Sequence, residues 1–593
     1  MKKQFLLVTT IICSGLMFGQ TQFAGHIAGP GGEVPYNMIS DNSGNILLCG
    51  VFDATVDFDP TAGFYEMTSV NPYDGFIAKY DSSGSLIWAK QFGTYIYFVE
   101  VDALNNIYAT GRLEGTKDVD PSPANYELTS NGLTDGVMIK LTNAGELIWA
   151  FNIGGEGTDG MGSIQLNDNN EIYVSGGFTE EVDFDPSGDI YNLTPTNPGI
   201  YVINTGFIAK YDTDANFIWA KRIATAGNIN LHKDVPAEEY FILSTAGFSA
   251  SSTDSADYDP SDVGFVSPVP DPLPDGNYMA IIKYDADGNY IWSQFPRTYG
   301  SLGVSDLVIY DVDLDVEENI YFTGSFQGSF DEYPENIISL EPFIPFTGSP
   351  DGLLIKLDLN GNLVWEKRFG SGYAWDYGSD LILDHENNIH LIGSFQYEGE
   401  FNEGGTSEIL ESFGSYDMFI TGFSTDGEFL YKGHVGATGS DGGMRIITQG
   451  NNIVTTGIFE YTVDCDPFGT ETFYTAAGYQ DIFLTGYHNE WATEITDTTI
   501  IDTTLLILQN EFNFTTEVFP NPFTNYTSLK IDADGASSFI IKVYDLTGRL
   551  VETLISSENN ASLIIGRSLG SGTYLVKVET ENASRINYII KTE

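Results

Sequence analysis

The stretch DGFIAKYDSSGSLIWAKQFG, residues 74–93, recurs along this chain of 593 residues. It returns as DGVMIKLTNAGELIWAFNIG at 135–154 and as TGFIAKYDTDANFIWAKRIA at 205–224. Further copies begin near Asp275, Asp351, Asp417 and Asp481. A chain of this length is expected to hold several domains or a repeat, and seven copies of one phrase indicate a repeat.

A second phrase, an apolar run that closes on glycine, alternates with the first. It begins as NILLCG at 45–50, ends as NIVTTG at 452–457, and also occurs seven times. Successive closing glycines lie 61 to 77 residues apart. Two phrases with equal counts and regular spacing define seven units of one structural design.

Each unit has the pattern of four short β-strands. In the first unit YNMIS meets the turn DNSGN and the strand NILLCGVF, and a longer loop leads to GFIAKY, the turn DSSGS and SLIWAKQF. Such turns are typical of hairpins, and the repeats show no sustained helical period. Seven four-stranded sheets predict an all-β, seven-bladed β-propeller, which protects its sheet edges by radial repetition. A right-handed β-helix is the alternative, but it needs shorter coils and no hairpin turns at both strand ends.

The two ends of the array predict how the ring closes. The last unit lacks a fourth strand, because NEWATEITDTT after DIFLTGYH (481–488) matches no repeat phrase. QFAGHIAGPGGE at 22–33 resembles FLYKGHVGATGSDG at 429–442, which ends the sixth unit. We therefore expect a strand over Phe23–Ala28 to complete the seventh blade.

The recurring aromatic residues have a structural interpretation. Phe76, Ile77 and Tyr80 are expected to pack between blades, and Trp88 to fill the gap beside the next blade. Equivalent tryptophans stand in four other units: Trp149, Trp219, Trp292 and Trp365. The alternative is that each is a platform for sugar stacking.

The repeat resembles a bacterial β-propeller family with the signature D-x-F-[IV]-A-K-Y-[DN]…G…W. Asp74–Trp88 and its copies carry the match, over residues 21–490. The match weakens in the fourth unit and in the last two, where Gly422 and Gly486 replace the lysine. The resemblance implies a propeller and no single activity.

The N-terminus MKKQFLLVTTIICSGLMFGQ has the pattern of a secretory signal peptide over residues 1–20. Two lysines precede a short apolar run, which is followed by Gly19 and Gln20; an uncleaved membrane anchor is the alternative. The remaining Cys49 and Cys465 allow one disulfide at most, and two buried thiols are the favoured interpretation. No other segment is apolar enough to cross a membrane.

The formal net charge of −58 argues against a nucleic-acid partner and an anionic membrane, since both require basic surface. Bound or screening cations would reduce the self-repulsion of such a chain.

An acidic phrase ending in proline recurs between the second and third strands of a unit. It reads VDFDP (56–60), KDVDP (117–121), VDFDP (182–186), ADYDP (256–260) and VDCDP (463–467), whereas FDEYP (330–334) and FNE (401–403) depart from it. Carboxylates two residues apart can present oxygens to calcium. The tentative metal ligands are Asp57, Asp59, Asp118, Asp120, Asp183, Asp185, Asp257, Asp259, Asp464 and Asp466. The alternative is a solvated strand edge with Phe58 or Phe184 packed inward and proline ending the strand.

Strand parity places these acidic loops on the same face as the glycine-rich blade connections, such as FGSGYAWDYGS at 369–379. This face is the candidate for ligand binding. The turns DADGN (285–289), DTDAN (212–216) and DLNGN (358–362) are interpreted as hairpin turns, because they lack the late acidic ligand of an EF-hand. The six histidines form no HExxH pair, and neither a nucleophile elbow nor a phosphate loop occurs in a convincing context.

Composition changes after about residue 490. Residues 491–514 form a Thr-rich linker, and residues 515–593, which are nearly neutral, predict a small Ig-like β-sandwich. VFPNPF (518–523), VYDLTGRLV (543–551) and LGSGTYLVKVE (569–579) resemble the C-terminal sorting domain of the bacterial type IX secretion system. The resemblance implies interaction with that machinery, passage across the outer membrane, and release or attachment at the cell surface.

Together these features predict a secreted or cell-surface, monomeric propeller that reaches its destination through the periplasm. We expect a non-catalytic protein that binds a glycan, a protein or a cation, with no certain cofactor and with calcium as the candidate ion. The alternative is a secreted polysaccharide hydrolase or lyase with its site in the propeller channel. A purely structural adhesin stiffened by calcium is a third hypothesis.

Overall fold

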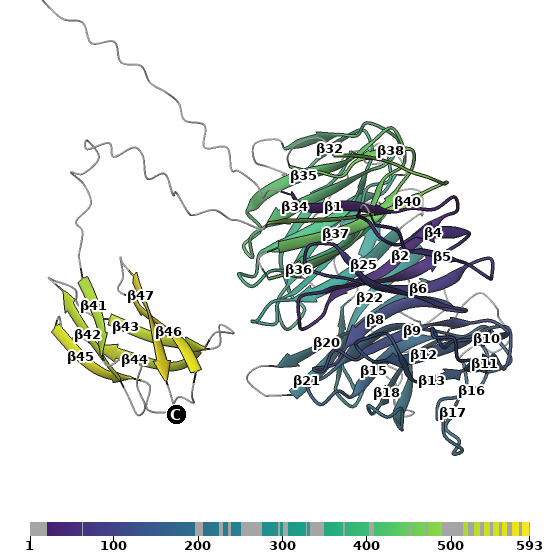
Figure 1. Cartoon of the computed structure of the whole chain (residues 1–593), viewed down its shortest axis with the longest axis horizontal. Helices are drawn as coiled ribbons and strands as arrows, with labels where there is room; N and C mark the ends of the chain where they lie inside the picture. Colours follow the sequence, from purple (N-terminus) through teal and green to yellow (C-terminus); the bar gives the residue numbers. More distant parts are fainter. Residues whose placement is uncertain are drawn as a thin grey trace, which may run out of the picture. The chain divides into compact units, whose positions relative to one another are not determined.

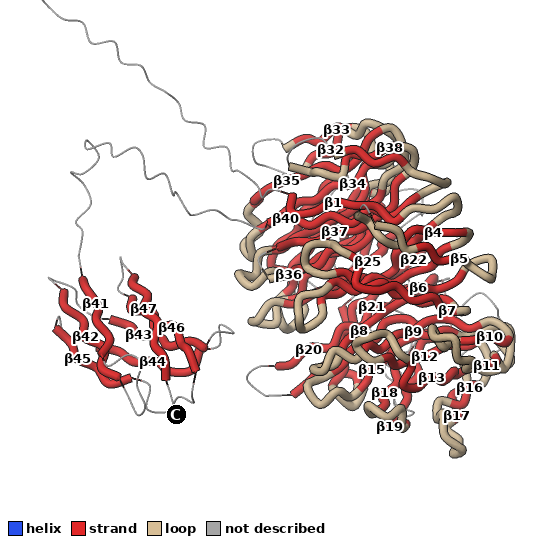
Figure 2. Tube along the Cα trace, viewed as in Figure 1, coloured by secondary structure: helices blue, strands red, loops and turns tan. Residues whose placement is uncertain are grey.

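The computed structural model describes residues 21–61, 63–195, 205–223, 229–234, 239–250, 276–294, 297–299, 306–327, 329–331, 349–371, 374–401, 408–450, 452–468, 472–488, 514–519, 527–533, 539–545, 550–556, 560–565, 572–579 and 584–591. The chain divides into two compact units, Met1–Ala492 and Thr493–Glu593. The described residues are built from strands and loops, without a helix (Figure 2). The predicted signal peptide, residues 1–20, lies outside the described residues.

The first unit contains seven four-stranded antiparallel blades, which confirms the seven-bladed β-propeller. One parallel bridge, between Asn277 and Asp306, joins the fourth and fifth blades, and the sixth blade continues into an outer hairpin. Blade 1 contains β2 (Glu33–Ser40), β3 (Ile46–Phe52), β6 (Asp74–Tyr80) and β7 (Leu86–Phe92); blade 2 contains β8 (Tyr95–Val101), β9 (Ile107–Leu113), β12 (Asp135–Leu141) and β13 (Leu147–Ile153); blade 3 contains β14 (Gly160–Leu166), β15 (Ile172–Phe178), β18 (Thr205–Tyr211) and β19 (Phe217–Ile223).

The remaining blades follow the same order, from the innermost strand to the outermost strand. Blade 4 contains β20 (Ile229–Asp234), β21 (Glu239–Ala250), β22 (Gly276–Asp285) and β23 (Tyr290–Gln294); blade 5 contains β25 (Asp306–Leu314), β26 (Ile320–Gln327), β28 (Asp351–Leu357) and β29 (Leu363–Phe369); blade 6 contains β30 (Tyr377–Leu383), β31 (Ile389–Phe395), β34 (Asp417–Phe423) and β35 (Phe429–Ala437); blade 7 contains β36 (Gly442–Gln449), β37 (Asn452–Phe459), β40 (Asp481–His488) and β1 (Thr21–Ile27).

Blade 7 combines strands from both ends of the propeller. β1 pairs antiparallel with β40, with Phe23 opposite Gly486 and Ile27 opposite Ile482. In Figure 1 the purple β1 lies among the green strands of the last blades. His26 faces Phe483 as His434 faces Phe419 in blade 6, which is the alignment expected from the two GH phrases. The strand ends at Ile27, and Ala28 instead bridges to Asp57 of the first blade.

The core lies between the blades. Every residue of β3 and β6 is buried, because neighbouring sheets cover both faces of these middle strands. Phe76, Ile77 and Tyr80 are fully buried, as predicted. The tryptophans contact the hairpin turn of the next blade. The Trp88 indole N–H donates to the Asn143 carbonyl (3.3 Å). Trp149 and Trp365 donate in the same way to the carbonyls of Thr213 (3.3 Å) and Thr425 (2.9 Å).

The glycines that replace lysine in blades 6 and 7 make room for an aromatic ring. A Cβ on Gly422 would lie 2.1 Å from Cε1 of Tyr431, and one on Gly486 would lie 2.3 Å from Cε1 of Phe23. Tyr431 and Phe23 face these glycines, as Trp88 faces Lys79 in blade 1. In these two blades glycine therefore replaces the lysine, and another aromatic residue replaces the tryptophan that lies opposite it.

The acidic phrases lie in small outer hairpins, although the sequence indicated only a longer loop there. The pairs are β4 (Thr55–Asp57) with β5 (Glu66–Thr68), β10 (Thr116–Asp118) with β11 (Glu127–Thr129), β16 (Val182–Asp183) with β17 (Asn192–Leu193), β32 (Glu398–Glu400) with β33 (Ile409–Glu411), and β38 (Thr462–Asp464) with β39 (Phe473–Thr475). In the fifth unit β24 (Arg297–Tyr299) pairs with β27 (Ser329–Asp331). Phe58 and Phe184 are fully buried and anchor their hairpins.

The second unit contains two antiparallel sheets. One sheet is β41 (Phe514–Phe519), β42 (Thr527–Ala533) and β45 (Asn560–Ile565); the other is β44 (Leu550–Ser556), β43 (Phe539–Asp545), β46 (Gly572–Glu579) and β47 (Ser584–Lys591). Leu529, Ile531 and Ile565 of the first sheet share a core with Ile541 and Val576 of the second. The predicted linker, 491–514, lies outside the described residues except for Phe514, and the Ig-like topology stays a prediction.

Candidate functional site

The innermost strands of the blades surround a cavity of about 380 Å³ in the centre of the propeller. All seven of these strands, β2, β8, β14, β20, β25, β30 and β36, contribute lining residues. Its volume falls within the range of ligand pockets in proteins. The channel is therefore the candidate site, and its chemistry depends on which inner-strand residues face it.

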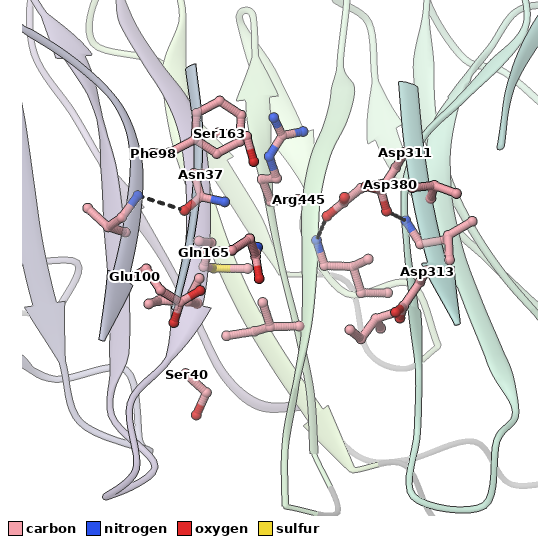
Figure 3. Close-up of a pocket in the computed structure, with 18 of the residues that line it drawn as sticks. Asn37, Ser40, Phe98, Glu100, Ser163, Gln165, Asp311, Asp313, Asp380 and Arg445 are labelled. Carbon is pink, nitrogen blue, oxygen red and sulfur yellow. Dashed lines mark hydrogen bonds between the residues drawn. The ribbon is translucent and has the colours of Figure 1, made fainter. Parts of the chain in front are cut away.

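Six of the seven inner strands have a register irregularity at the same position. The shifts lie at Pro35/Asn37, Ile96/Phe98, Met161/Ile164, Ile309/Asp311, Gly378/Asp380 and Gly443/Arg445. An extra residue in one strand twists it and redirects its side chains. Here the bulge brings a first set of residues into the channel, which consists of Asn37, Phe98, Ser163, Asp311, Asp380 and Arg445. Figure 3 shows a second set, Glu100, Gln165 and Asp313, further along the channel.

The channel residues connect each inner strand to the next blade. The side-chain oxygen of Asn37 accepts the backbone N–H of Val99 (3.1 Å). Asp311 Oδ2 accepts the N–H of Leu381 (3.2 Å), and Asp380 Oδ2 accepts that of Ile446 (2.7 Å). An inner strand is a sheet edge with unpaired N–H groups, so these acceptors satisfy donors that no strand can reach.

Asp311 and Asp380, on neighbouring blades, form a coupled acidic pair. Burial, and then the charges of Asp380 and Asp313, raises the pKa of Asp311 well above its usual value. Burial raises the pKa of Asp380 to about 6, while the nearby Arg445 guanidinium and hydrogen bonds from Ile446 and Asp311 lower it in part. Because the two carboxyl groups are hydrogen-bonded to each other, they share a proton. At neutral pH this pair is a hydrogen-bonding centre that is both donor and acceptor.

Two further carboxyl groups in the channel are partly protonated near neutral pH. Burial raises the pKa of Glu100 to about 7 and that of Asp313 to about 7. The channel therefore carries less negative charge than its four acidic residues imply. Neutral and charged hydrogen-bonding groups stand side by side around it, with Arg445 as the cation.

Four of the tyrosines in the inner strands lie at or before the middle of their strand, and one of them lines the cavity. Tyr310 lines the cavity and is 42% exposed, and Tyr36 and Tyr97 occupy the corresponding bulge positions of blades 1 and 2. The rings of Tyr36 and Tyr97 are 5.2 Å apart, and those of Tyr310 and Tyr377 are 5.4 Å apart. Burial raises the pKa of Tyr36 to about 12, so its hydroxyl stays protonated. We call Tyr36, Tyr97, Tyr310 and Tyr377 the tyrosine mouth.

The predicted acidic-loop residues have a turn-capping geometry. Asp57 Oδ1 accepts the N–H groups of Asp59 (3.1 Å) and Tyr65 (2.8 Å), and Asp59 Oδ1 accepts that of Thr61 (3.0 Å). The same bonds recur at Asp118 and Asp120, at Asp183 and Asp185, and at Asp464 and Asp466. Asp257 and Asp259 lie outside the described residues.

Calcium binding by these loops stays a prediction. Among the residues that the structure describes, no group of three His, Cys, Asp or Glu side chains is arranged to hold a metal ion. The loops lie in separate blades, so the structure brings together only the two aspartates of each hairpin. Their observed partners are backbone N–H groups, which is the geometry of the strand-edge alternative.

The hairpin turns on the opposite face follow one pattern. Asp285 Oδ1 accepts the N–H groups of Asp287 (3.0 Å) and Asn289 (2.8 Å), and the Asn289 amide donates to Oδ2 (2.8 Å). The turns at Asp212 and Asp358 repeat these bonds. The hairpin interpretation of these three sequences matches this geometry. Cys49 and Cys465 are buried free thiols.

The sequence interpretation missed the channel residues. The only sequence signal is a polar residue, of varying chemistry, at one place in the first strands of five blades, such as Asn37 in YNMIS, and it lies in a strand and not in a loop. The bulge hides them further, because it breaks the alternation that would mark a side chain as facing the channel.

One family model matches the chain: residues 517–592 match the secretion system C-terminal sorting domain. An uncharacterized WD repeat-containing protein of Acanthamoeba polyphaga mimivirus is 26% identical over 262 residues, which cover 40% of this chain and 18% of the relative. The chain therefore spans less than a fifth of that relative. WD repeats build propellers, in agreement with the fold described above.

Two solved structures match this chain at low similarity. A structural genomics protein of unknown function from Bacteroides thetaiotaomicron VPI-5482 is 10% identical, with a TM-score of 0.22, and the match covers 77% of this chain and 98% of that one. Dimeric latent PorU from Porphyromonas gingivalis is 10% identical, with a TM-score of 0.12, and the match covers 73% of this chain and 32% of that one.

The sorting domain establishes the route of this protein. It is exported by the type IX secretion system through interaction with that machinery, and is attached to the cell surface or released. Among the described residues, no helix is long and apolar enough to span a membrane. The sorting domain does not determine what the propeller does, which depends on the channel and surfaces of the propeller.

Proposed function

We propose that the propeller is an extracellular glycan-binding protein whose ligand enters the central channel through the tyrosine mouth. The observation that carries this proposal is the shared bulge of the inner strands. At this bulge the structure has tyrosine rings in blades 1, 2 and 5 and polar channel residues in blades 1, 3, 5, 6 and 7.

The chemistry of the site favours a polyhydroxylated ligand. Tyrosine rings provide flat apolar faces with a polar tip, which suit the faces and hydroxyl groups of sugars. The partly protonated carboxyl groups below supply both donors and acceptors. With a net charge of −58 the chain repels anionic polymers, so neutral sugars and amino sugars are the preferred class.

Trp375 extends the aromatic surface of this face. It lies in the connection from blade 5 to blade 6 and is 61% exposed. Tyr377, two residues later, belongs to the tyrosine mouth. An exposed tryptophan beside a channel would contact sugar units that extend beyond it.

The test is a glycan array probed with the mature chain from residue 21, followed by calorimetry on the glycans that bind. Tyr310→Ala should weaken binding about tenfold or more, the loss expected for one stacked aromatic residue. Tyr65→Ala is the matched control, because Tyr65 is also 42% exposed but lies in an outer loop of blade 1. Equal affinity of the Tyr310 variant and the wild type would refute binding at this mouth.

A second candidate function is hydrolysis of the bound glycan. It would need a general acid, and the raised pKa values of Asp311, Asp380, Glu100 and Asp313 favour that role. Asp311 and Asp380 are hydrogen-bonded to each other, closer than the separation of about 5 Å or more between the two carboxyl groups of a glycosidase, so this pair would act as one acid with Glu100 or Asp313 as the second group. Product analysis of each bound oligosaccharide would decide between the two functions. Products that disappear in both Asp311→Asn and Asp380→Asn would support the enzyme, and unchanged oligosaccharide with the wild type would contradict it.

A further inference from the structure

The junction of blades 7 and 1 contains buried carboxylate oxygens that lack hydrogen-bond partners. Glu33 begins β2 and Asp481 begins β40, and neither is exposed to solvent. Both Oε atoms of Glu33 and Oδ1 of Asp481 have no hydrogen-bond partner. Asp481 Oδ2 accepts the backbone N–H of Ala477 (2.9 Å), and backbone N–H groups of Gly478 and Gly29 act on the same carboxylate. A parallel bridge between Gly32 and Gln480 holds the two segments side by side.

Glu33 differs from the acidic residues at the same position in other blades, because its carboxylate accepts no backbone N–H group. At the same place in blades 3, 6 and 7 stand Asp159, Asp376 and Asp441. Each accepts one backbone N–H from the segment that precedes it and one from the residue that follows the second strand of its blade. Glutamate is one methylene longer than aspartate, and its carboxylate lies beyond those donors. Asp53 Oδ1 instead accepts the N–H of Gly32 (2.6 Å).

Backbone oxygens crowd the same place. The Cβ that Gly29 lacks would lie 2.7 Å from Glu33 Oε1 and 2.7 Å from the Thr55 carbonyl oxygen. A Cβ on Gly478 would lie 2.4 Å from the carbonyl oxygens of both Gly29 and Gly31. Glycines at these positions therefore leave small spaces lined by oxygen atoms, of which the Gly31 carbonyl oxygen also accepts the N–H of Tyr479 (3.1 Å).

No side-chain cation balances this group among the described residues. His26 Nε2 lies 3.8 Å from Asp481 Oδ2, but burial lowers the pKa of His26, so it is mostly neutral at pH 7. No lysine or arginine in the part of the chain that the structure describes forms an ion pair with Glu33 or Asp481. Burial, and then the charges of Asp481 and Asp53, raises the pKa of Glu33 to about 9.

We propose that Glu33 and Asp481 bind a calcium ion at this junction, and that the ion stabilises the closure of the ring by β1. Calcium takes six to eight oxygens in irregular geometry, so two carboxylates, backbone carbonyls such as that of Thr55, and water form a suitable set. Magnesium requires an octahedral shell and fits this arrangement less well. The site differs from the acidic loops in Glu33, neither of whose carboxylate oxygens accepts an N–H group, whereas the loop aspartates accept such groups.

The ion would connect three parts of the chain. Asp481 belongs to the last strand of the array and Glu33 to the first blade, while Gly29 and Gly31 follow directly after β1. Calcium is available at millimolar concentration outside cells, where this protein is delivered. A weak site is therefore occupied at its destination.

The test measures the melting temperature of the mature chain in chelator, in 5 mM Mg²⁺ and in 5 mM Ca²⁺. Calcium should raise it by about 2–5 °C and magnesium by clearly less. In Glu33→Gln the calcium shift should disappear, and its melting temperature in chelator should equal or exceed that of the wild type, because a buried charge is removed. The control Glu66→Gln, on exposed β5, should keep the full shift.

Two results would overturn the proposal. Without a calcium shift in the wild type, Glu33 is held as a neutral acid. A shift that persists in Glu33→Gln but is lost in Asp57→Asn combined with Asp118→Asn and Asp183→Asn would place the ion in the acidic loops. If Glu33→Gln does not fold, hydrogen exchange of the wild type decides: calcium should slow exchange in residues 21–27 and 481–488 and leave blade 3 unchanged.

Discussion

The Nζ atom of Lys79 lies 2.6 Å from Oδ2 of Asp41, and the two side chains are 3% and 0% exposed. Lys79 stands in β6, Asp41 in the turn after β2, and the lysine also donates to Asn143 of the next blade. The recurring lysine of the repeat is therefore a link within a blade and between blades. Lys356 repeats this role with Asp315 (3.7 Å) and Thr425.

Removing Lys79 should destabilise the propeller strongly. Lys79→Met leaves Asp41 buried without its cation, which costs about 3–5 kcal/mol in the free energy of unfolding. The matched control is Lys432→Met, because the Lys432–Glu408 pair (2.9 Å) is 25% and 31% exposed and should cost at most about 1 kcal/mol. Urea denaturation measures both, and equal losses would contradict this assignment.

Acid should weaken the same ion pair. Burial alone would raise the pKa of Asp41, but hydrogen bonds from Asn45 and Lys79 bring it below its usual value. The stabilisation by Asp41 is thus present above the unfolded pKa of about 4 and is lost as the pH falls through the lower folded pKa. The stability difference between the wild type and Lys79→Met should shrink below about pH 4.

A second group of carboxyl residues should make the protein more stable in mild acid than in base. Burial raises the pKa of Asp159 to about 6 and those of Asp376 and Asp441 to about 7. Because the folded pKa exceeds the unfolded one, the free energy of unfolding falls as the pH rises from about 4 to about 7. Denaturation at pH 5 and pH 8 checks this, and Asp441→Asn should reduce the difference. Greater stability at pH 8 would contradict it.

Phe23 and Gly486 should be coupled energetically. Phe23→Ala removes the ring that β1 packs onto blade 7, at about 2–4 kcal/mol, and Gly486→Ala introduces a methyl group into that ring, at about 1–3 kcal/mol. In the double variant the methyl group meets no ring, so the combined loss should be smaller than the sum. Additive losses in a double-mutant cycle would show that the two residues do not contact.

Deleting residues 514–593 should block export. The deletion removes every residue of the sorting domain and leaves the described strands of the propeller intact. The truncated chain should accumulate in the periplasm, where fractionation and immunoblotting would detect it. Normal delivery of the truncated chain would contradict the assigned role, and deletion of the acidic hairpin β10–β11 serves as a control that retains the export signal.

Sequence reasoning reached the fold because the repeat encodes it locally. Each middle strand is apolar on both faces, and each turn carries Asp, Asn or Gly where the backbone requires them, as at Gly84 with φ of +77°. The interpretation of QFAGHIAG as part of the seventh blade rested on a likeness of a few residues, and β1 lies there in the structure.

The channel residues could not be predicted from the sequence in the way that the fold was. Asp311, Asp380 and Arg445 occupy equivalent positions but differ in chemistry, so no repeated motif marks them. Their importance arises from the convergence of strands that are about 65 residues or more apart in sequence, and from a bulge that shifts the side-chain alternation by one residue. Similarly, nothing in the sequence distinguishes Glu33 from the other acidic residues until its neighbours are placed.

The position of β40 within blade 7 governs how the protein withstands mechanical load. β40 lies between β1 and β37, and the chain leaves it at His488 toward the C-terminal unit. When the protein is held by that unit, tension enters along a strand that is hydrogen-bonded on both sides. Rupture then requires two ladders to slide in shear together, whereas without β1 the strand would be an edge that peels away one bond at a time.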